Sequence, residues 1–221
     1  MINDFWDPIL LSIKIASIAS IIVMVIGTVI ANYMAKNVFK GKMLLETLLL
    51  LPLVLPPSVI GFILIIIFGA NSPIGQMIES IFNSTVIFTW WAGLIAAIVV
   101  SFPLMYQMTK AGFKHIDINI EEAARVDGAN EIAVFFKITL PLSINYIISG
   151  FVLSFTRSLG EFGATLMFAG NIPGKTQTVS TAIFVAIDSG KMGLAWLWVF
   201  SIIIVSFSLL LFIQRINDPR K

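Results

Sequence analysis

ILLSIKIASIASIIVMVIGTVIANYM, residues 9–34, is an almost unbroken apolar run in which Lys14 is the one charged residue. A helix needs about 20 apolar residues to cross the hydrocarbon core of a bilayer, so this run is long enough to span a membrane. Four further apolar runs cover residues 44–69, 85–108, 138–156 and 194–213, and among these only the first carries a charge, at Glu46. The sequence therefore predicts an all-α integral membrane protein with about five transmembrane helices.

Composition supports this class and excludes others. The 221 residues are 58% hydrophobic and 12% charged, whereas soluble domains carry about 25% charged residues. There is no cysteine, which excludes disulfides and thiolate metal sites, and the single histidine, His115, has no neighbouring ligands. The spans contain no paired carboxylates and no nucleophile with a base, and the basic residues form no nucleic-acid-binding block. We therefore expect no catalytic residue, no metal site, no nucleic-acid partner and no enzymatic activity.

The basic residues predict the orientation, because cytoplasmic loops of membrane proteins carry an excess of lysine and arginine. The N-terminal tail and the loop 70–84 hold none. Ten of the fourteen lie in the first loop, the third loop and the C-terminal tail: Lys36, Lys40, Lys42, Lys110, Lys114, Arg125, Lys137, Arg215, Arg220 and Lys221. We expect the N-terminus outside, the C-terminus in the cytoplasm, and the long loop 115–137 on the cytoplasmic face.

That cytoplasmic loop contains NIEEAARVDG, residues 119–128, which predicts a short helix. Asn119 can cap its start, with Glu122 three residues later, as in a capping box. Gly128 supplies the permissive backbone that a chain needs to turn out of a helix. A second helical stretch, 131–138, leads toward Pro141. The pattern indicates a helix, a hinge and a helix; an ordinary amphipathic helix that caps the bundle is the alternative interpretation.

The order Glu122-Ala123-Ala124, three residues, Gly128, nine residues, Ile138-Thr139-Leu140-Pro141 resembles the EAA loop of ABC importer permeases at every fixed position. The resemblance implies a single permease domain over residues 1–221 with the type I ABC importer fold. It also implies that the loop is a coupling helix, which sits in a groove of a separate ATPase subunit that uses ATP and Mg²⁺; this chain would bind no cofactor. The coupling residues would be Glu122, Ala123, Ala124, Asp127, Gly128, Ile138, Leu140 and Pro141.

A second segment, SFTRSLGEFGATLMFAGNIPGKTQT at 154–178, is similar to molybdate-type oxyanion permeases, as is LPLVLPP at 51–57. Sulfate permeases share the Arg-x-x-Gly-Glu-Phe-Gly portion less completely beyond it. Membership of the molybdate ABC transporter permeases implies molybdate import across a prokaryotic plasma membrane by a homodimer that binds two ABC ATPase subunits and an external molybdate-binding protein. The alternatives are sulfate, thiosulfate or tungstate as cargo and, from another class, a membrane assembly or structural protein.

Polar and small residues recur at intervals of three and four toward the end of the fourth span, and such a stripe faces protein or water rather than lipid. Arg157 and Glu161, four residues apart, can pair. Either the stripe lines the translocation pathway, with Arg157 favouring an oxyanion, or the pair locks the end of a helix. The candidate pathway and gate residues are Ser154, Arg157, Ser158, Gly160, Glu161, Gly163 and Thr165.

Glycines and Pro173 make a continuous helix beyond residue 160 improbable, which suggests a broken external gate. The segment 169–176, AGNIPGKT, has the relaxed form of a phosphate-binding loop, but it lacks the strand and helix context of one. We therefore expect no nucleotide site in this chain.

Overall fold

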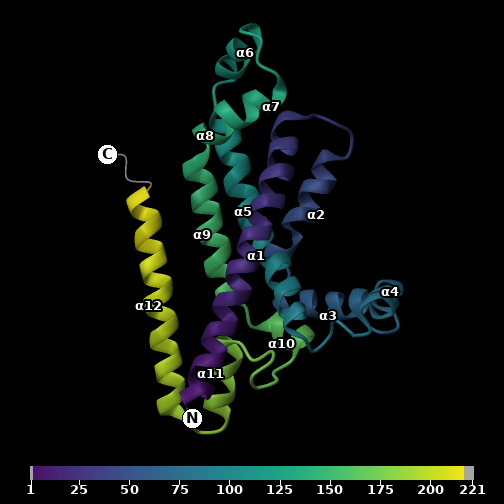
Figure 1. Ribbon diagram of the computed structural model, residues 1–221, viewed down its shortest axis with the longest axis vertical. Coiled ribbons are helices and arrows are strands. Elements are labelled where there is room, and N and C mark those ends of the chain that lie inside the picture. Colours follow the sequence, from purple (N-terminus) through teal and green to yellow (C-terminus); the bar gives the residue numbers. More distant parts are fainter. Residues whose placement is uncertain (1, 217–221) are drawn as a thin grey trace.

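The computed structural model describes residues 2–216, and every regular element within that range is a helix (Figure 1). Arg220 and Lys221, which entered the orientation argument, lie outside the described residues. Within residues 2–216, three helices are long and apolar enough to cross a membrane: α1 (Ile2–Lys36), α5 (Trp90–His115) and α12 (Met192–Ile216). Two bent pairs pass the same test together, which brings the number to five if each pair is one span. This range agrees with the predicted count of about five.

The core of the bundle is formed by α1, α5 and α9 (Ile144–Leu159), which lie side by side (Figure 1). Small residues let the helices approach closely, as is typical of membrane helix contacts. A Cβ atom added at Gly112 would lie 2.6 Å from the Tyr146 Cβ, and one at Gly150 would lie 2.9 Å from the Met105 Sδ. The glycines of α5 and α9 therefore set the distance between these two helices.

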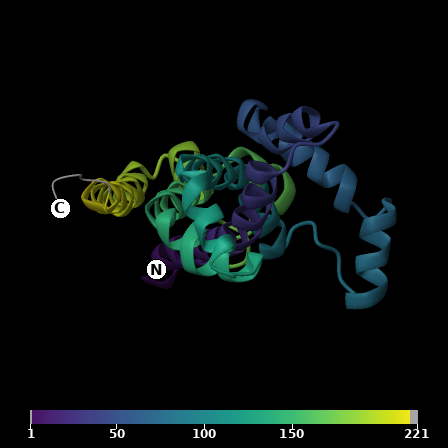
Figure 2. The same ribbon diagram turned by 90° about the horizontal axis from the view of Figure 1, so that it is seen from above.

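The second apolar run forms two helices, α2 (Lys42–Val54) and α3 (Pro57–Phe68), which are bent by 116°. Leu55 between them is extended because a residue that precedes a proline avoids the α conformation. Pro56 and Pro57 thus stand at a full break between two helices, not at a kink within one. With α4 (Pro73–Phe82), α3 projects from the bundle as an arm (Figure 2).

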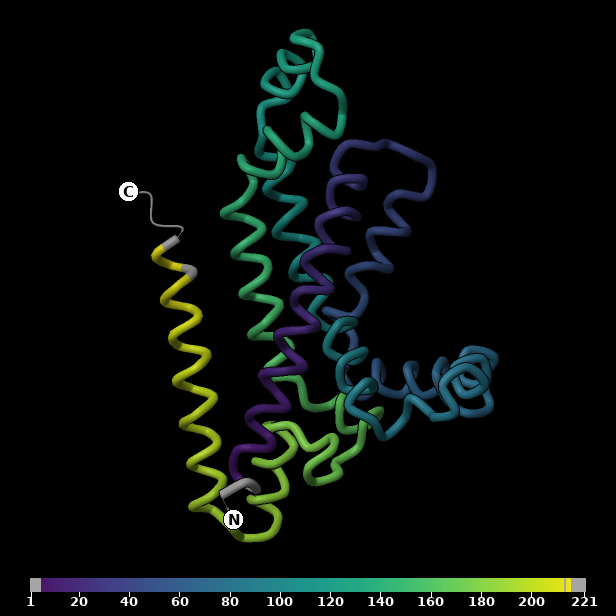
Figure 3. The backbone as a smooth tube through the Cα atoms, viewed as in Figure 1, coloured from purple at the N-terminus to yellow at the C-terminus, as the bar shows by residue number. Residues whose placement is uncertain are grey.

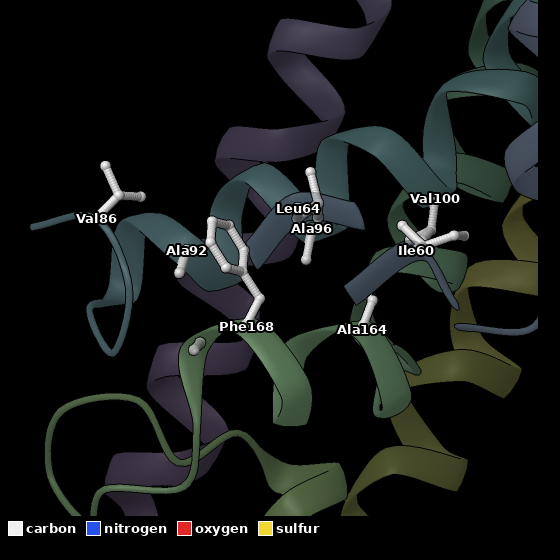
Figure 4. Close-up of a cluster of buried hydrophobic side chains, with 9 residues drawn as sticks. Ile60, Leu64, Val86, Ala92, Ala96, Val100, Ala164 and Phe168 are labelled. Atoms are coloured by element: carbon white, nitrogen blue, oxygen red, sulfur yellow. The ribbon is translucent and has the colours of Figure 1, made fainter. Parts of the chain in front are cut away.

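At the base of this arm, α10 (Gly163–Ala169) packs against α3 and α5. Figure 4 shows Phe168 reaching from α10 into a cluster with Leu64 and Ala92. The contact is close, because a Cβ atom at Gly61 of α3 would lie 2.6 Å from the Met167 Cβ. As the glycines predicted, no single helix continues through this region: α9 ends at Leu159, and the chain turns before α10 begins.

The last two helices are α11 (Val179–Asp188) and α12, which stands beside the bundle (Figure 3). Near the N-terminus of the chain, Trp198 of α12 donates a hydrogen bond from Nε1 to the carbonyl of Phe5 (3.0 Å), and the two rings stack. Most of α12 is otherwise exposed, as expected for a helix whose surroundings are lipid.

The connection from α5 to α9 is itself helical and extends beyond the end of the bundle (Figure 1). It consists of α6 (Ile118–Val126), α7 (Glu131–Val134), a π-helical turn η1 (Phe135–Thr139) and α8 (Leu140–Leu142). The stretch Glu131–Leu142 and α9 form the second bent pair, with an angle of 69° between them.

Candidate functional site

The projecting loop has the predicted order of helix, hinge and helix, but its start is capped by a different residue. Asp117 is the N-cap of α6, and its Oδ1 accepts from the backbone N–H of Asn119 (3.0 Å). Asn119 was expected to be the cap and instead lies one residue inside the helix. Gly128 has φ +90°, the left-handed conformation that a glycine adopts without strain, so the predicted hinge is present. Asn130 then caps α7 by accepting from the N–H of Ala133 (2.8 Å).

Glu121 anchors this loop to the bundle. Only 7% of it is exposed, and its two carboxylate oxygens each lie 2.9 Å from the Lys36 Nζ at the end of α1. The hydroxyl of Thr139 in η1 also donates to this carboxylate, and Arg125 lies 3.3 Å from it within α6. One side chain therefore joins α1, α6 and η1.

The environment of Glu121 favours its charged form. Burial raises the pKa of this carboxyl group, but hydrogen bonds from Thr139, Lys36 and Arg125 and the charge of Lys36 outweigh burial, so the pKa lies below its ordinary value. The partner Arg125 also pairs with Glu131 across the hinge, with Nε 2.6 Å from Oε1, and this hydrogen bond lowers the pKa of Glu131. The Arg125–Glu131 pair thus bridges α6 and α7 across Gly128.

The residues predicted to face the ATPase lie mainly on the outer side of the loop. Glu122, Ala123, Asp127, Gly128 and Pro141 are exposed, and Ala124, Ile138 and Leu140 are partly buried. Large apolar side chains are exposed beside them, with Val126 at 87% and Ile132 at 70%. The loop therefore has a pinned inner side and an uncovered outer side of small and apolar residues.

Sequence reasoning missed Glu121, Lys36 and Thr139 as members of the site. Thr139 lies inside the quoted motif, and Glu121 stands four residues before Arg125, the spacing of a helical ion pair. Lys36, however, is 85 residues from its partner Glu121, and nothing local in the sequence connects them.

At the other end of the bundle, Glu161 links α9 to α10. Its Oε2 lies 2.6 Å from the Arg157 Nη1, and its Oε1 accepts from the backbone N–H of Ala164 (2.8 Å). The Glu161 side chain is 2% exposed, whereas that of Arg157 is 30% exposed. Glu161 thus satisfies a donor at the start of α10, a structural role, while the guanidinium of Arg157 remains accessible from one side.

The two serines of the predicted stripe face α5. The Ser154 hydroxyl donates to the carbonyl of Ser101 on α5 (3.3 Å), and Ser158 donates to that of Ala97 (3.5 Å). Thr165 is buried, Gly160 is exposed, and Gly163 packs against Pro57, where an added Cβ atom would lie 2.8 Å away. Of the charged groups in the stripe, Arg157 is the accessible one.

Long apolar helices, a helix–hinge–helix loop held to one end of the bundle and a broken helix at the other end define a multi-pass membrane protein. The chain belongs to the family of binding-protein-dependent transport system inner membrane components, whose sequence model matches residues 23–221.

The chain is similar to molybdenum transport permeases. It is 55% identical to YvgM of Bacillus subtilis, assigned as a molybdenum transport system permease protein, over 96% of this chain and 94% of the relative. It is 42% identical to the molybdenum transport system permease protein ModB of Escherichia coli K12, over 97% and 96% of the two chains. The sulfate transport system permease protein CysT of Salmonella typhimurium is 35% identical, over 84% and 70%.

Solved structures support the fold. A bacterial ABC transporter involved in the import of the acidic polysaccharide alginate matches with a TM-score of 0.77 and 15% identity, over 99% of this chain and 81% of that chain. The MetNI methionine ABC transporter matches with a TM-score of 0.69 and 12% identity, over 98% and 94%. The fold is that of a type I ABC importer permease.

Proposed function

We propose that this chain is the permease subunit of an ATP-driven importer that carries molybdate across the plasma membrane of a prokaryote. Two molybdenum transport permeases, at 55% and 42% identity over nearly their full lengths, support molybdate as the cargo. The sulfate permease has a lower sequence identity and aligns with a smaller part of this chain, so sulfate is the second candidate. Thiosulfate and tungstate have no separate observation in their favour.

The role that we propose for the loop 115–137 rests on the contrast between its two sides. Glu121 is buried and held by three donors, whereas Ala123 and Val126 in the same helix are exposed. A loop that merely capped the bundle would bury its apolar residues. Here the inner side is fixed to α1, and the uncovered outer side is suited to close contact with an ATPase subunit, as in a coupling helix. ATP and Mg²⁺ would be used by that partner.

The assembly we propose is a homodimer of this chain with two ABC ATPase subunits and an external molybdate-binding protein. The N-terminus lies outside and the C-terminus in the cytoplasm, because the basic residues gather in the loops that this orientation places inside. Reporter fusions after Met77 and after His115 test the topology. They should report opposite sides of the membrane, and the same side for both would refute it.

Arg157 is the residue we propose to contact the anion in the pathway, because its guanidinium is charged and partly accessible. Glu161 holds Arg157 in place and caps α10. Uptake by Arg157→Lys variants that still assemble tests this role. A fall in the uptake rate with normal assembly would support it, and unchanged uptake would leave Arg157 as a structural partner of Glu161 alone.

Uptake of labelled molybdate, in cells with and without this chain, tests the function as a whole. We expect uptake to require the chain and to be reduced only weakly by excess sulfate. Unchanged uptake after deletion would refute the assignment, and uptake abolished by equimolar sulfate would favour the sulfate alternative.

A further inference from the structure

A pocket with two lysines lies at the end of the bundle opposite the projecting loop, where the start of α1, the start of α5 and the loop 170–178 meet. Its volume is about 450 Å³, within the range of small-molecule sites, and it is lined by Leu11, Lys14, Phe88, Thr89, Trp90, Gly174 and Lys175. We propose that this pocket binds a doubly charged tetrahedral oxyanion at the external mouth of the permease. The inference deepens the proposed function and rests on it for the identity of the cargo.

The first positive charge comes from α1. The Lys14 Nζ lies 4.3 Å from the centre of the Trp90 ring, a cation–π contact that fixes the ammonium group beside the start of α5. Lys14 lines the pocket, and its ammonium group carries three hydrogen-bond donors that an anion can use.

The second positive charge stands on a hydrogen-bonded turn. The carbonyl of Ile172 accepts from the backbone N–H groups of Lys175, Thr176 and Gln177, at 3.0, 2.9 and 3.1 Å. The Thr176 hydroxyl, which is buried, accepts from the N–H of Ile172 in return. These bonds form a compact turn that presents Lys175 to the pocket. The turn is the same segment whose sequence imitates a nucleotide-binding loop.

The start of α5 adds a weaker attraction. Thr89 is the N-cap, but its hydroxyl donates to the carbonyl of Val86 and forms no cap hydrogen bond to α5. The positive end of the helix dipole at Trp90 is therefore not occupied by the Thr89 side chain. The start of a helix does not make a site by itself, but its positive potential adds to the attraction that the two lysines exert on an anion.

An acidic residue lies nearby and limits where the anion can sit. Asp7 lines a smaller neighbouring cavity of about 250 Å³, together with Lys14, Gly174 and Gln177. Asp7 does not line the larger pocket, which Lys175 does line. The oxyanion therefore binds on the Lys175 side of Lys14, away from the Asp7 carboxylate.

The test is protection of lysines from acetylation in the purified complex of the permease with its ATPase, without the binding protein. The two ammonium groups are modified with acetic anhydride, and the extent at each lysine is read by mass spectrometry. Molybdate at a concentration that fills about 80% of the pockets should slow acetylation of Lys14 and Lys175 by about fivefold. Sodium chloride at the same ionic strength should not protect them.

Lys191 is the matched control, because it is exposed and lies between α11 and α12, outside both cavities. Protection of Lys191 to the same degree would indicate a general ionic effect and overturn the proposal, as would no protection at Lys14 and Lys175. In a Lys175→Gln variant, whose substitution lies at an exposed loop position, molybdate should no longer protect Lys14 from acetylation.

Two further results distinguish anion binding in this pocket from the transport function of the chain. If the loaded binding protein protects both lysines while free molybdate does not, the pocket is a protein-docking surface and the proposal fails. If sulfate protects and molybdate does not, while uptake of molybdate still requires the chain, the pocket does not hold the cargo and the proposal fails while the proposed function stands. Uptake measured in parallel with the unaltered chain reports on the function separately.

Discussion

Replacing Glu121 with glutamine should loosen the projecting loop while leaving the bundle intact. The substitution keeps the shape and one acceptor oxygen for Thr139, but it removes the charge that Lys36 and Arg125 face. Because Lys36 and Arg125 are 30% and 33% exposed, we count their ion pairs as surface pairs of about 0.5 kcal/mol each. The buried bond to Thr139 falls from a charged to a neutral one, a loss of about 1 kcal/mol.

These losses total about 2 kcal/mol, which corresponds to a roughly thirtyfold increase in the population of the locally opened loop. Hydrogen–deuterium exchange at the amides of α6, in the purified protein in detergent, measures the population of this opened loop. Exchange there should accelerate by about that factor, while the amides of α5 and α9 should be unchanged.

Glu122→Gln is the control, because Glu122 is the next residue in the same helix and is exposed. Its effect on exchange should remain within about 0.5 kcal/mol, or roughly twofold. If the two substitutions accelerated α6 equally, or if neither did, the assignment of Glu121 as the anchor would be refuted. In the assembled transporter we expect the opposite ranking: Glu122→Gln should weaken the contact with the ATPase subunit more than Glu121→Gln does.

Gly112→Ala should destabilise the bundle by about 1–3 kcal/mol, because the added methyl would lie 2.6 Å from the Tyr146 Cβ. Gly193→Ala meets nothing within 4 Å and should stay within about 0.5 kcal/mol; equal melting temperatures for the two would contradict this packing. Asn130→Ala removes the cap of α7 and should cost about 1 kcal/mol, seen as faster amide exchange in 131–134, whereas unchanged exchange there would argue against the cap. Because the pKa of Glu121 is lowered below its ordinary 4.5, its stabilisation of the loop is complete above that pH and is lost as the pH falls through the folded value. Exchange of α6, corrected for intrinsic rates, should thus rise only below pH 4.5, and a rise near neutral pH would contradict the sign.

The helical class, the approximate number of spans and the helix–hinge–helix loop could be predicted because each depends on local composition. Apolar length identifies a span, and a glycine after a short polar helix identifies the hinge at Gly128. The start of α6 was placed two residues late, since Asp117 and Asn119 are both good caps and only the backbone conformation decides between them.

What could not be predicted depends on contacts between distant segments. Glu121 and Glu122 are adjacent acidic residues, and in a nine-residue helix with polar residues on most sides the periodicity does not tell which of them faces inward. The answer comes from Lys36 at the end of α1. In the same way, the second oxygen of Glu161 finds the N–H of Ala164 only once the chain has turned between α9 and α10, so spacing revealed the pair with Arg157 but not the cap.

The direction of the projecting loop depends on the number of residues in the π-helical turn at Phe135–Thr139. A π turn holds one residue more than the α-helical turn it replaces. Since each residue of an α-helix rotates the chain by roughly 100°, deleting one residue here would swing the preceding loop about a quarter of a turn around the axis leading to α9. The pattern from Glu122 to Pro141 would keep almost all of its residues, but the loop would face a different direction. A one-residue insertion or deletion in this turn would therefore redirect the loop, which a substitution that keeps the turn would not do.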